Sequence, residues 1–252
     1  MKDYKVSVVT VCYNSANEIE KTMQSVFSQD YHNIEYIIID GDSNDGTVDV
    51  IKKYASRISK WISEPDKGIY DAMNKGIEIA TGDWIIFLNA GDYYHSNDVF
   101  SRFINEISDD TTIAYGLIHY FTPESEFDME YIPIEQMEYL DPIPHPATMT
   151  KLCYHKNHLF DISFRSSGDY DFFYKAYYDD QVKFQFIPLI MTNFDNSKGV
   201  SKDNKSMIWK ENKRVWSKHA TFRLKIQMFQ KQVFSIIKRF VKNVIYSNYR
   251  FL

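Results

Sequence analysis

The sequence predicts an α/β fold built on a mostly parallel sheet, and three observations support this prediction. Strand-like and helix-like segments alternate through the first hundred residues, which implies right-handed crossovers between parallel strands. The run at 84–88 (WIIFL) is continuously apolar and has the length of a strand buried on both faces. With 252 residues and 44% hydrophobic content, the chain is long enough for one large domain or one domain with an appendage.

The bulk composition excludes several other classes of protein. No run of 18 or more apolar residues occurs, so no transmembrane helix is expected. The first residues, MKDY, lead directly into a strand-like segment, so we expect no signal peptide. Cys12 and Cys153 form no spaced framework, which fits a reducing compartment. The sequence therefore predicts a cytoplasmic protein.

The charge distribution divides the chain into two parts. Residues 205–252 contain 12 Lys or Arg and one acidic residue, whereas residues 1–204 contain 17 basic and 33 acidic residues. We expect a domain at 1–204, with halves at 1–110 and 111–204, and a basic helical tail at 205–252. Such a tail suggests an anionic partner.

The tail has an amphipathic pattern. Apolar residues recur at spacings of three and four, and four basic residues fall largely outside that stripe. The stripe comprises Phe222, Ile226, Phe229, Val233, Ile236, Phe240 and Val244, and the basic residues are Lys231, Lys238, Arg239 and Lys242. This is the pattern of a helix lying on an anionic membrane surface, here through 220–246. Packing on the domain or on a second copy of the chain is the alternative.

The expected elements follow in chain order. Strands are predicted at 5–13, 34–40 and 59–63, and helices at 19–27 and 48–55. A further helix begins near Ile69, and Gly82 is expected to end it in a left-handed conformation. Beyond residue 110, strands are predicted at 112–121, 129–134 and 183–190, a proline-rich bend at 141–146, and a helix at 169–178.

Two polar loops follow the first two strands. Thr10, Tyr13 and Asn14 end the first strand and are candidates to contact a base or ribose, although a plain turn has the same pattern. The loop Asp40-Gly-Asp-Ser-Asn-Asp-Gly46 is too irregular for a calcium loop, because its sixth position is not glycine and its twelfth is Ile51. We expect Asp40 to accept a hydrogen bond from a nucleobase, or else the loop is a solvated turn.

The segment from 63 to 92 carries candidates for phosphate and metal binding. Lys67 and Lys75 are possible phosphate partners, with a solvated helix face as the alternative. Asp92 follows the buried strand at 84–88, and carboxylates at the carboxyl end of such a strand are placed to bind ligands. Asp66, Asn74 and Asn89 are further candidates for contacts with the same donor.

Two carboxylates and a histidine are the candidates in the second half. Asp169 and Asp171 lie at a predicted helix start, where a carboxylate is usually a cap. A group transfer to a hydroxyl also needs a positioned base, and Asp169 is the candidate for it. His145, flanked by prolines, and Asp171 are candidates on the acceptor side, although a loop histidine is more often structural.

Together these segments resemble the family 2 glycosyltransferases, over about residues 4–200. Four motifs match in order: the strand ending in Thr-Val-Cys-Tyr-Asn14, the loop Asp40 to Thr47, the segment Ser63 to Gly76, and Gly82 to Asp92. The chain is most similar to bacterial members that build capsule, exopolysaccharide and O-antigen units. The resemblance implies the GT-A fold, a Rossmann-like nucleotide-diphospho-sugar transferase fold, and inverting transfer by a single displacement.

The resemblance also implies roles and partners. By position, Asp40 contacts the base, Asp92 ligates Mg²⁺ or Mn²⁺, and Asp169 is the catalytic base. The implied donor is a nucleotide sugar, with a UDP-sugar favoured, and the implied acceptor is a saccharide or lipid-linked saccharide. The enzyme would then be a metal-dependent hexosyltransferase, peripheral on the inner face of the cell membrane. No nucleic acid partner is expected.

The sequence departs from the family pattern at three places. The metal motif, usually Asp-x-Asp-Asp, is Asn89-Ala-Gly-Asp92; Gly168 stands where Glu is common; and Gly41 stands where many members have Asp. A catalytically weak or inactive nucleotide-sugar-binding protein of the same fold is therefore the alternative. Nucleotidyl transfer is less favoured, because no glycine-rich basic loop follows the first strand.

Overall fold

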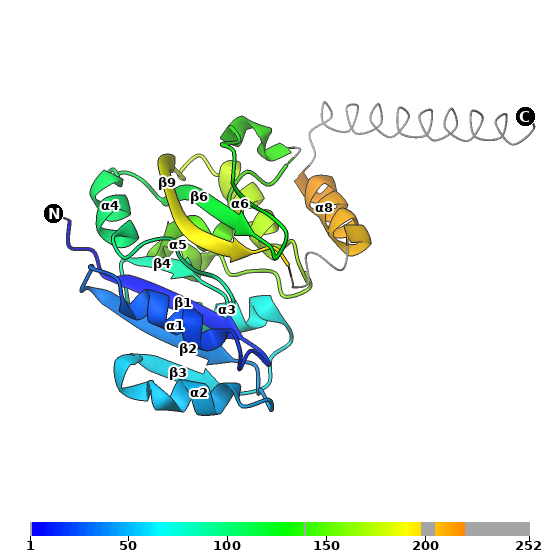
Figure 1. The fold of residues 1–252 in the computed structure, drawn as a ribbon. Helices are drawn as coiled ribbons and strands as arrows, with labels where there is room; N and C mark the ends of the chain where they lie inside the picture. The colour runs from blue at the N-terminus through cyan, green and yellow to red at the C-terminus, as the bar shows by residue number, and fades with distance from the viewer. Residues whose placement is uncertain (1, 139, 198–204, 220–252) are drawn as a thin grey trace, which may run out of the picture. The chain divides into compact units, whose positions relative to one another are not determined.

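A nine-stranded sheet forms the centre of the structure, a computed structural model that describes residues 2–138, 140–197 and 205–219 (Figure 1). The strand order is β3 (Lys60–Ser63), β2 (Ile34–Asp40), β1 (Val6–Cys12), β4 (Trp84–Phe87), β8 (Thr148–Lys151), β6 (Ile113–Phe121), β9 (Phe184–Asp195) and β5 (Tyr93–Tyr94), and β7 (Glu126–Asp128) pairs with β6.

The first four strands are parallel, which confirms the predicted α/β class. β1 pairs in parallel with β2 and β4, and β2 pairs in parallel with β3. β6 and β9 are also parallel, whereas β5, β7 and β8 run antiparallel to their neighbours. The register pairs Cys12 with Asp40 and Asp40 with Ser63. The loops at 13–16, 41–47, 64–68 and 88–92 therefore leave the sheet on one side, which we call the carboxyl edge.

Helices cover both faces of the sheet, because the central strands are apolar on both sides. On one face, Val6 and Val8 share a buried cluster with Ile19 of α1, Ile51 of α2 and Phe100 of α4. These helices span Ile19–Phe27, Thr47–Lys53 and Val99–Glu106.

On the other face, α3 packs so closely that a side chain at Gly76 would meet Val9 of β1. His155 of α5 lies beneath the ring of Phe172 of α6, at 4.2 Å between ring centroids, and also contacts Phe87 of β4. The helices α3, α5 and α6 span Ile69–Ile79, Leu152–Asn157 and Gly168–Tyr177.

The remaining described elements are short helices and the beginning of the tail. Three 3-10 turns span η1 (Ala55–Arg57), η2 (Ile134–Glu138) and η3 (His145–Ala147), and α8 spans Lys205–His219. The chain divides into two units at Asn212 and Lys213. The apolar stripe predicted between Phe222 and Val244 lies outside the described residues, and the domain boundary predicted at 204/205 stays a prediction. Within the described residues, no helix is long and apolar enough to cross a membrane.

Two local predictions are wrong. The strand expected at 129–134 is instead β7 at 126–128, followed by η2 from Ile134; Pro133, which has no N–H to donate to a ladder, separates them. Helix α3 ends at Ile79, and Gly82 is not left-handed. Position 82 requires glycine because the backbone there lies close to β1: a Cβ would lie 2.7 Å from the Lys5 carbonyl oxygen.

Candidate active site

Asp40 lies at the end of β2 with its carboxylate turned into the protein. The residue is fully buried, and its Oδ2 accepts hydrogen bonds from the Ser43 N–H at 3.0 Å and the Ser63 hydroxyl at 2.7 Å. Its Oδ1 accepts from the Ser43 hydroxyl at 2.5 Å and from the Cys12 thiol at 3.5 Å. Asp40 thus organises the loop that follows it, and its contact with a nucleobase stays a prediction.

The loops after β1 and β2 are joined by side chains. Asn14, at a positive φ of 48°, donates its N–H to the Ser43 hydroxyl and accepts the Asn44 N–H through Oδ1. Asp45 accepts the N–H of Ala16 and that of Thr47, the first residue of α2. Asp40 and Asp45 therefore bind backbone amides of these loops, which accounts for those two acidic positions without calcium.

The other two candidates at the end of β1 differ in exposure. Tyr13 is 63% exposed at the carboxyl edge. Thr10 is fully buried, and its hydroxyl is 3.0 Å from the Tyr36 hydroxyl. Of the two side chains, the Tyr13 ring is the one available to a ligand.

The two candidate lysines also differ. Lys75 pairs with Glu64 at 2.8 Å and donates to the Pro65 carbonyl. The Lys67 side chain is exposed and makes no ion pair with the described residues, so its charge is available to an anion. The Asn74 amide donates to the Phe160 carbonyl oxygen and accepts the Phe160 N–H.

The loop from Asn89 to Asp92 contains polar atoms with few protein partners. Asp92 is 5% exposed, and its Oδ1 accepts the Asp195 N–H at 3.2 Å. Burial raises the pKa of the Asp92 carboxyl to about 7, although the hydrogen bond from Asp195 acts in the opposite direction. The Asn89 Oδ1 atom is buried with no hydrogen-bond partner in the described part of the chain. The Asp92 carboxylate and the Asn89 amide thus both offer oxygen atoms that a cation could bind.

These oxygens fit a hard divalent cation in part. Mg²⁺ binds oxygen ligands and is commonly held by one or two carboxylates together with substrate phosphates. No group of three or more His, Cys, Asp or Glu side chains suited to a metal is found among the described residues. Asp92 and Asn89 would therefore supply the protein ligands, and a diphosphate and water would supply the remainder.

Asp169, the second residue of α6, is held from two sides. Its Oδ1 accepts the Tyr70 hydroxyl and the Tyr170 N–H, each at 2.9 Å, and its Oδ2 is 3.1 Å from His145 Nδ1. Burial alone would raise the pKa of Asp169, but the His145 and Tyr70 hydrogen bonds lower it below its ordinary value. Asp169 is therefore an ionised carboxylate, which is the state that a general base requires.

His145 connects Asp169 to the carboxyl edge. Its Nε2 is 3.1 Å from Nδ2 of Asn89. An amide nitrogen only donates, so in this orientation His145 accepts at Nε2, carries its proton on Nδ1, and donates it to Asp169. The structure thus brings Asn89, His145 and Asp169 into one hydrogen-bonded chain. Asp171 lies apart from it, buried and paired with Lys175 at 2.5 Å.

Two departures from the family pattern lie against other side chains. A Cβ at Gly41 would meet Oδ2 of Asp66, the movable end of that side chain, and one at Gly168 would lie 2.8 Å from the Tyr70 ring. The Tyr70 ring therefore leaves no space for a larger residue at position 168. Sequence reasoning missed Tyr70, because nothing in a local pattern relates it to Asp169, 99 residues away.

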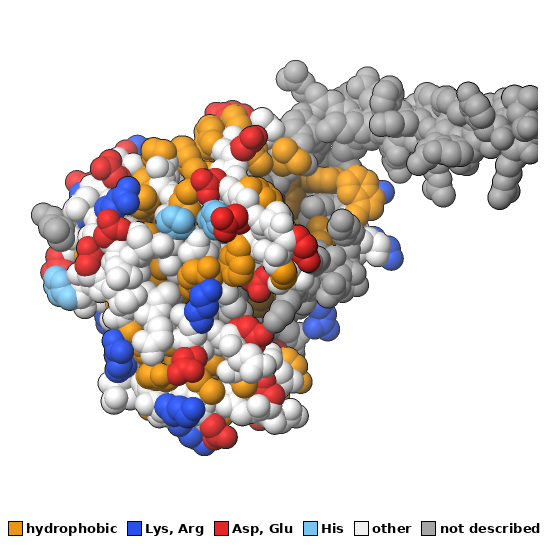
Figure 2. Space-filling model, viewed as in Figure 1, with side chains coloured by type: hydrophobic (Ala, Val, Ile, Leu, Met, Phe, Trp, Pro, Cys, Tyr) orange, Lys and Arg blue, Asp and Glu red, His pale blue; other side chains and the backbone are white. Residues whose placement is uncertain are grey.

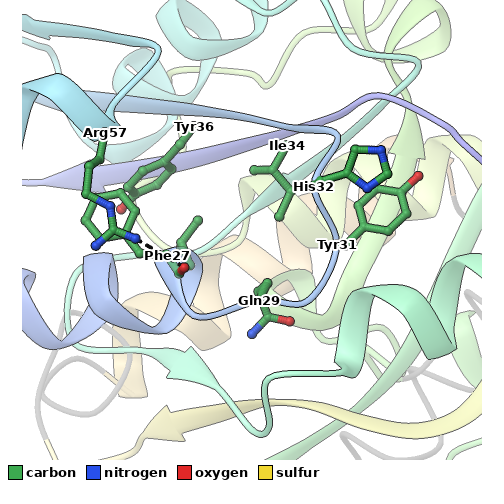
Figure 3. A pocket seen from close by; sticks show the side chains of 8 residues that line it. Phe27, Gln29, Tyr31, His32, Ile34, Tyr36 and Arg57 are labelled. Atoms are coloured by element: carbon green, nitrogen blue, oxygen red, sulfur yellow. Dashed lines mark hydrogen bonds between the residues drawn. The ribbon is translucent and has the colours of Figure 1, made fainter.

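A cavity of about 340 Å³ lies elsewhere, where α1 leads into β2 (Figure 3). Its lining includes Phe27, Tyr36 and Arg57, with the Arg57 guanidinium 4.0 Å from the Phe27 ring centroid. None of the candidate site residues lines it. Acidic and basic side chains are interspersed on the face shown in Figure 2, so this face has no extended patch of one charge.

Comparison with known proteins places the chain in a family. The Glycosyl transferase family 2 profile matches residues 7–172. An uncharacterized glycosyltransferase of Mycobacterium tuberculosis is 39% identical over 41% of this chain and 40% of its own length. A PGL/p-HBAD biosynthesis glycosyltransferase of Mycobacterium bovis is 31% identical over 44% of this chain and 45% of its own. The chain therefore spans less than half the length of these two relatives.

Solved structures agree on the fold. S. aureus TarS in complex with UDP-GlcNAc superposes with a TM-score of 0.64 at 18% identity, over 77% of this chain and 59% of TarS. A mannosyltransferase of Pyrobaculum calidifontis, in complex with GDP-Man and Mn²⁺, superposes with a TM-score of 0.62 at 15% identity. The match covers 84% of this chain and 61% of the mannosyltransferase. These likenesses show a GT-A fold, and the family match over most of the chain shows that the protein belongs to glycosyl transferase family 2.

Proposed function

We propose that the protein is an inverting glycosyltransferase that moves a hexose from a nucleoside diphosphate sugar to an acceptor hydroxyl. One observation carries the proposal: an ionised Asp169, held by His145 and Tyr70, is linked through Asn89 to the loop that contains Asp92. A base and a diphosphate-binding loop at one sheet edge are the two parts that a single displacement requires.

The proposed mechanism assigns each part a task. Tyr13 and the loop organised by Asp40 bind the nucleoside, and Lys67 stabilises the diphosphate by its charge. A bound Mg²⁺ or Mn²⁺, held by Asp92 and Asn89, would neutralise charge that builds on the departing diphosphate. Asp169 takes the acceptor proton while that oxygen attacks the anomeric carbon from the face opposite the diphosphate. The bond between that carbon and the diphosphate oxygen breaks, its electron pair stays on the oxygen, and the configuration inverts.

The proposed donor is a UDP-sugar, with a GDP-sugar as the second choice. TarS is solved with UDP-GlcNAc and the Pyrobaculum enzyme with GDP-Man and Mn²⁺, and those two donors represent the classes to test. The experiment is a screen of nucleotide sugars for thermal stabilisation and for release of nucleoside diphosphate, with and without Mn²⁺. We expect one donor class to give both signals.

The screen also separates the alternatives. The reduced metal motif, with Asp92 as its one acid, favours a nucleotide-sugar-binding protein without catalysis as the second candidate. Stabilisation by a donor without diphosphate release, in the presence of diverse saccharide acceptors, would support that candidate. Release of pyrophosphate instead would indicate nucleotidyl transfer.

The proposed acceptor is a lipid-linked glycan of bacterial surface polysaccharide synthesis, reached from the cytoplasmic face of the membrane. The support is the basic, amphipathic pattern of 220–246 and the biosynthetic name of the M. bovis relative. Co-sedimentation with anionic liposomes tests it, using the full chain and a chain ending at His219. Binding that is lost with the tail and weakened by salt supports it, and a full chain that stays in the supernatant contradicts it.

A further inference from the structure

Glu211 of α8 binds the loop that leads into α6. Its Oε1 accepts the N–H of Arg165 at 2.8 Å, and its Oε2 accepts those of Ser166 and Ser167 at 2.9 and 3.0 Å. Glu211 is also the one acidic residue among residues 205–252, which contain 12 Lys and Arg. A single carboxylate in a basic segment thus satisfies three consecutive backbone donors.

The contact holds the backbone that leads into the helix. Ser167 is the N-cap of α6 and makes no side-chain capping bond, so its N–H is one of the donors that a helix start leaves without a partner in the helix; the Arg165 and Ser166 N–H groups precede the helix. A negative charge at this end is also favoured by the helix dipole. Glu211 therefore fixes the start of α6 from 44 residues away in the sequence.

The loop at 165–167 contacts both halves of the proposed site. Arg165 donates through Nη1 to the Lys67 carbonyl oxygen at 2.9 Å. The next residue, Gly168, lies against the Tyr70 ring with no space for a Cβ. Asp169 follows directly and accepts the Tyr70 hydroxyl. A shift of this loop would therefore move the carboxylate of Asp169 and the backbone at Lys67 together.

From these contacts we infer that Glu211 is a positioning residue for the Asp169 base, a role that rests on the proposed function. It touches no reacting group, and acts by fixing the loop that precedes Asp169. Small misplacements of a base lower the rate of the chemical step strongly. The carboxylate is required, because glutamine in its place would offer one oxygen and turn an N–H donor toward the loop amides.

The test uses the full chain with Glu211→Ala, Glu211→Gln and the matched control Glu124→Gln, an exposed residue outside the site. Hydrogen exchange by mass spectrometry reports on the peptide that contains 165–168, and steady-state kinetics report kcat and the donor KM. We expect faster exchange in this peptide, kcat lowered about tenfold or more, and a smaller change in the donor KM, because the loop also contacts the backbone at Lys67. The control should match wild type.

Chemical rescue distinguishes positioning from a general loss of structure. Acetate or formate added to Glu211→Ala should restore part of kcat, because a small carboxylate can occupy the amides that the truncation exposes. The longer glutamine side chain should prevent rescue in Glu211→Gln. Wild-type kcat in both variants, or loss of kcat without rescue and with faster exchange throughout the chain, would overturn the inference. A wild-type protein inactive with every donor would overturn the proposed function itself.

Discussion

Two buried carboxylates, Glu35 and Asp92, lie at opposite ends of the strands of one sheet and differ in their partners and in the direction of their pKa shifts. Glu35, near the start of β2, accepts hydrogen bonds from the Ser7 hydroxyl and from the N–H and hydroxyl of Thr81, each at 2.7 Å. Lys5 and Lys60 lie 3.4 and 3.6 Å away. Burial alone would raise the pKa of Glu35, but these partners lower it to about 2.

Asp92, at the carboxyl edge, is as buried as Glu35 but has one hydrogen bond to its carboxylate in the described part of the chain. Its pKa is raised to about 7, with burial as the main cause. The hydrogen bonds and lysines around Glu35 offset the cost of burying its charge, so Glu35 stabilises the fold. The single hydrogen bond to Asp92 offsets little of that cost, so the Asp92 carboxylate is suited to bind a ligand of opposite charge, and groups with perturbed pKa values of this kind are common at functional sites.

The largest expected effect is a loss of transfer activity on substitution of Asp169, at the same edge as Asp92. Asp169→Asn should lower transfer by about 10² to 10⁴-fold, because the general base is lost, while donor affinity stays near that of wild type. Product formation and donor binding are measured separately, by chromatography and calorimetry. Glu35→Gln serves as the control at the opposite edge and should retain turnover. Transfer by Asp169→Asn at the wild-type rate would remove Asp169 from its role.

The next effect concerns stability. Glu35→Ala should lower the free energy of unfolding by about 3 kcal/mol, because it leaves two lysines and the Ser7 and Thr81 donors without their buried partner. Urea denaturation at pH 7 measures it, and Glu124→Ala, at an exposed position, should stay within about 0.5 kcal/mol of wild type. A loss as small as that of the control would show that Glu35 is not a structural anchor.

The smallest effect is a pH dependence of opposite sign at the two edges. Glu35 has a lowered pKa, so its contribution is present above its ordinary value of 4.5 and is lost as pH falls through about 2. Asp92 has a pKa raised from 3.8 to about 7, so its contribution is fully present below 3.8 and wild type loses that stability as pH rises from there through about 7.

Asp92→Asn should therefore be more stable than wild type at pH 8 in EDTA, by about 1–2 kcal/mol. The full shift corresponds to about 4 kcal/mol, but the amide loses the stronger charge-assisted hydrogen bond from Asp195. The difference should disappear toward pH 4. Thermal unfolding across this range measures it, and an Asp92→Asn variant that is less stable than wild type at pH 8 would break the comparison.

The parts of the fold and the site that depend on local sequence patterns could be predicted from the sequence. The parallel strands, the buried run at 84–88 and the polar loops at the carboxyl edge follow from periodicity within a few residues. The wrong strand at 129–134 lies where Pro133 interrupts an apolar run. The contacts of Tyr70 with Asp169 and of Glu211 with the loop at 165–167 join residues 99 and 44 positions apart. No spacing in the sequence reports such contacts, because they depend on how α3, α6 and α8 pack.

The most direct measurement is the number of protons released when a nucleoside diphosphate binds with Mn²⁺ at pH 7. Calorimetry in buffers of different ionisation enthalpy gives this number for wild type and for Asp92→Asn. With its pKa at about 7, Asp92 is about half protonated at this pH and must lose its proton to bind a cation. We predict that wild type releases about half a proton more than the variant, binds more tightly, and loses both differences in EDTA. Equal proton release and equal affinity in the two proteins would contradict the assignment of the Asp92 charge to a bound cation and diphosphate.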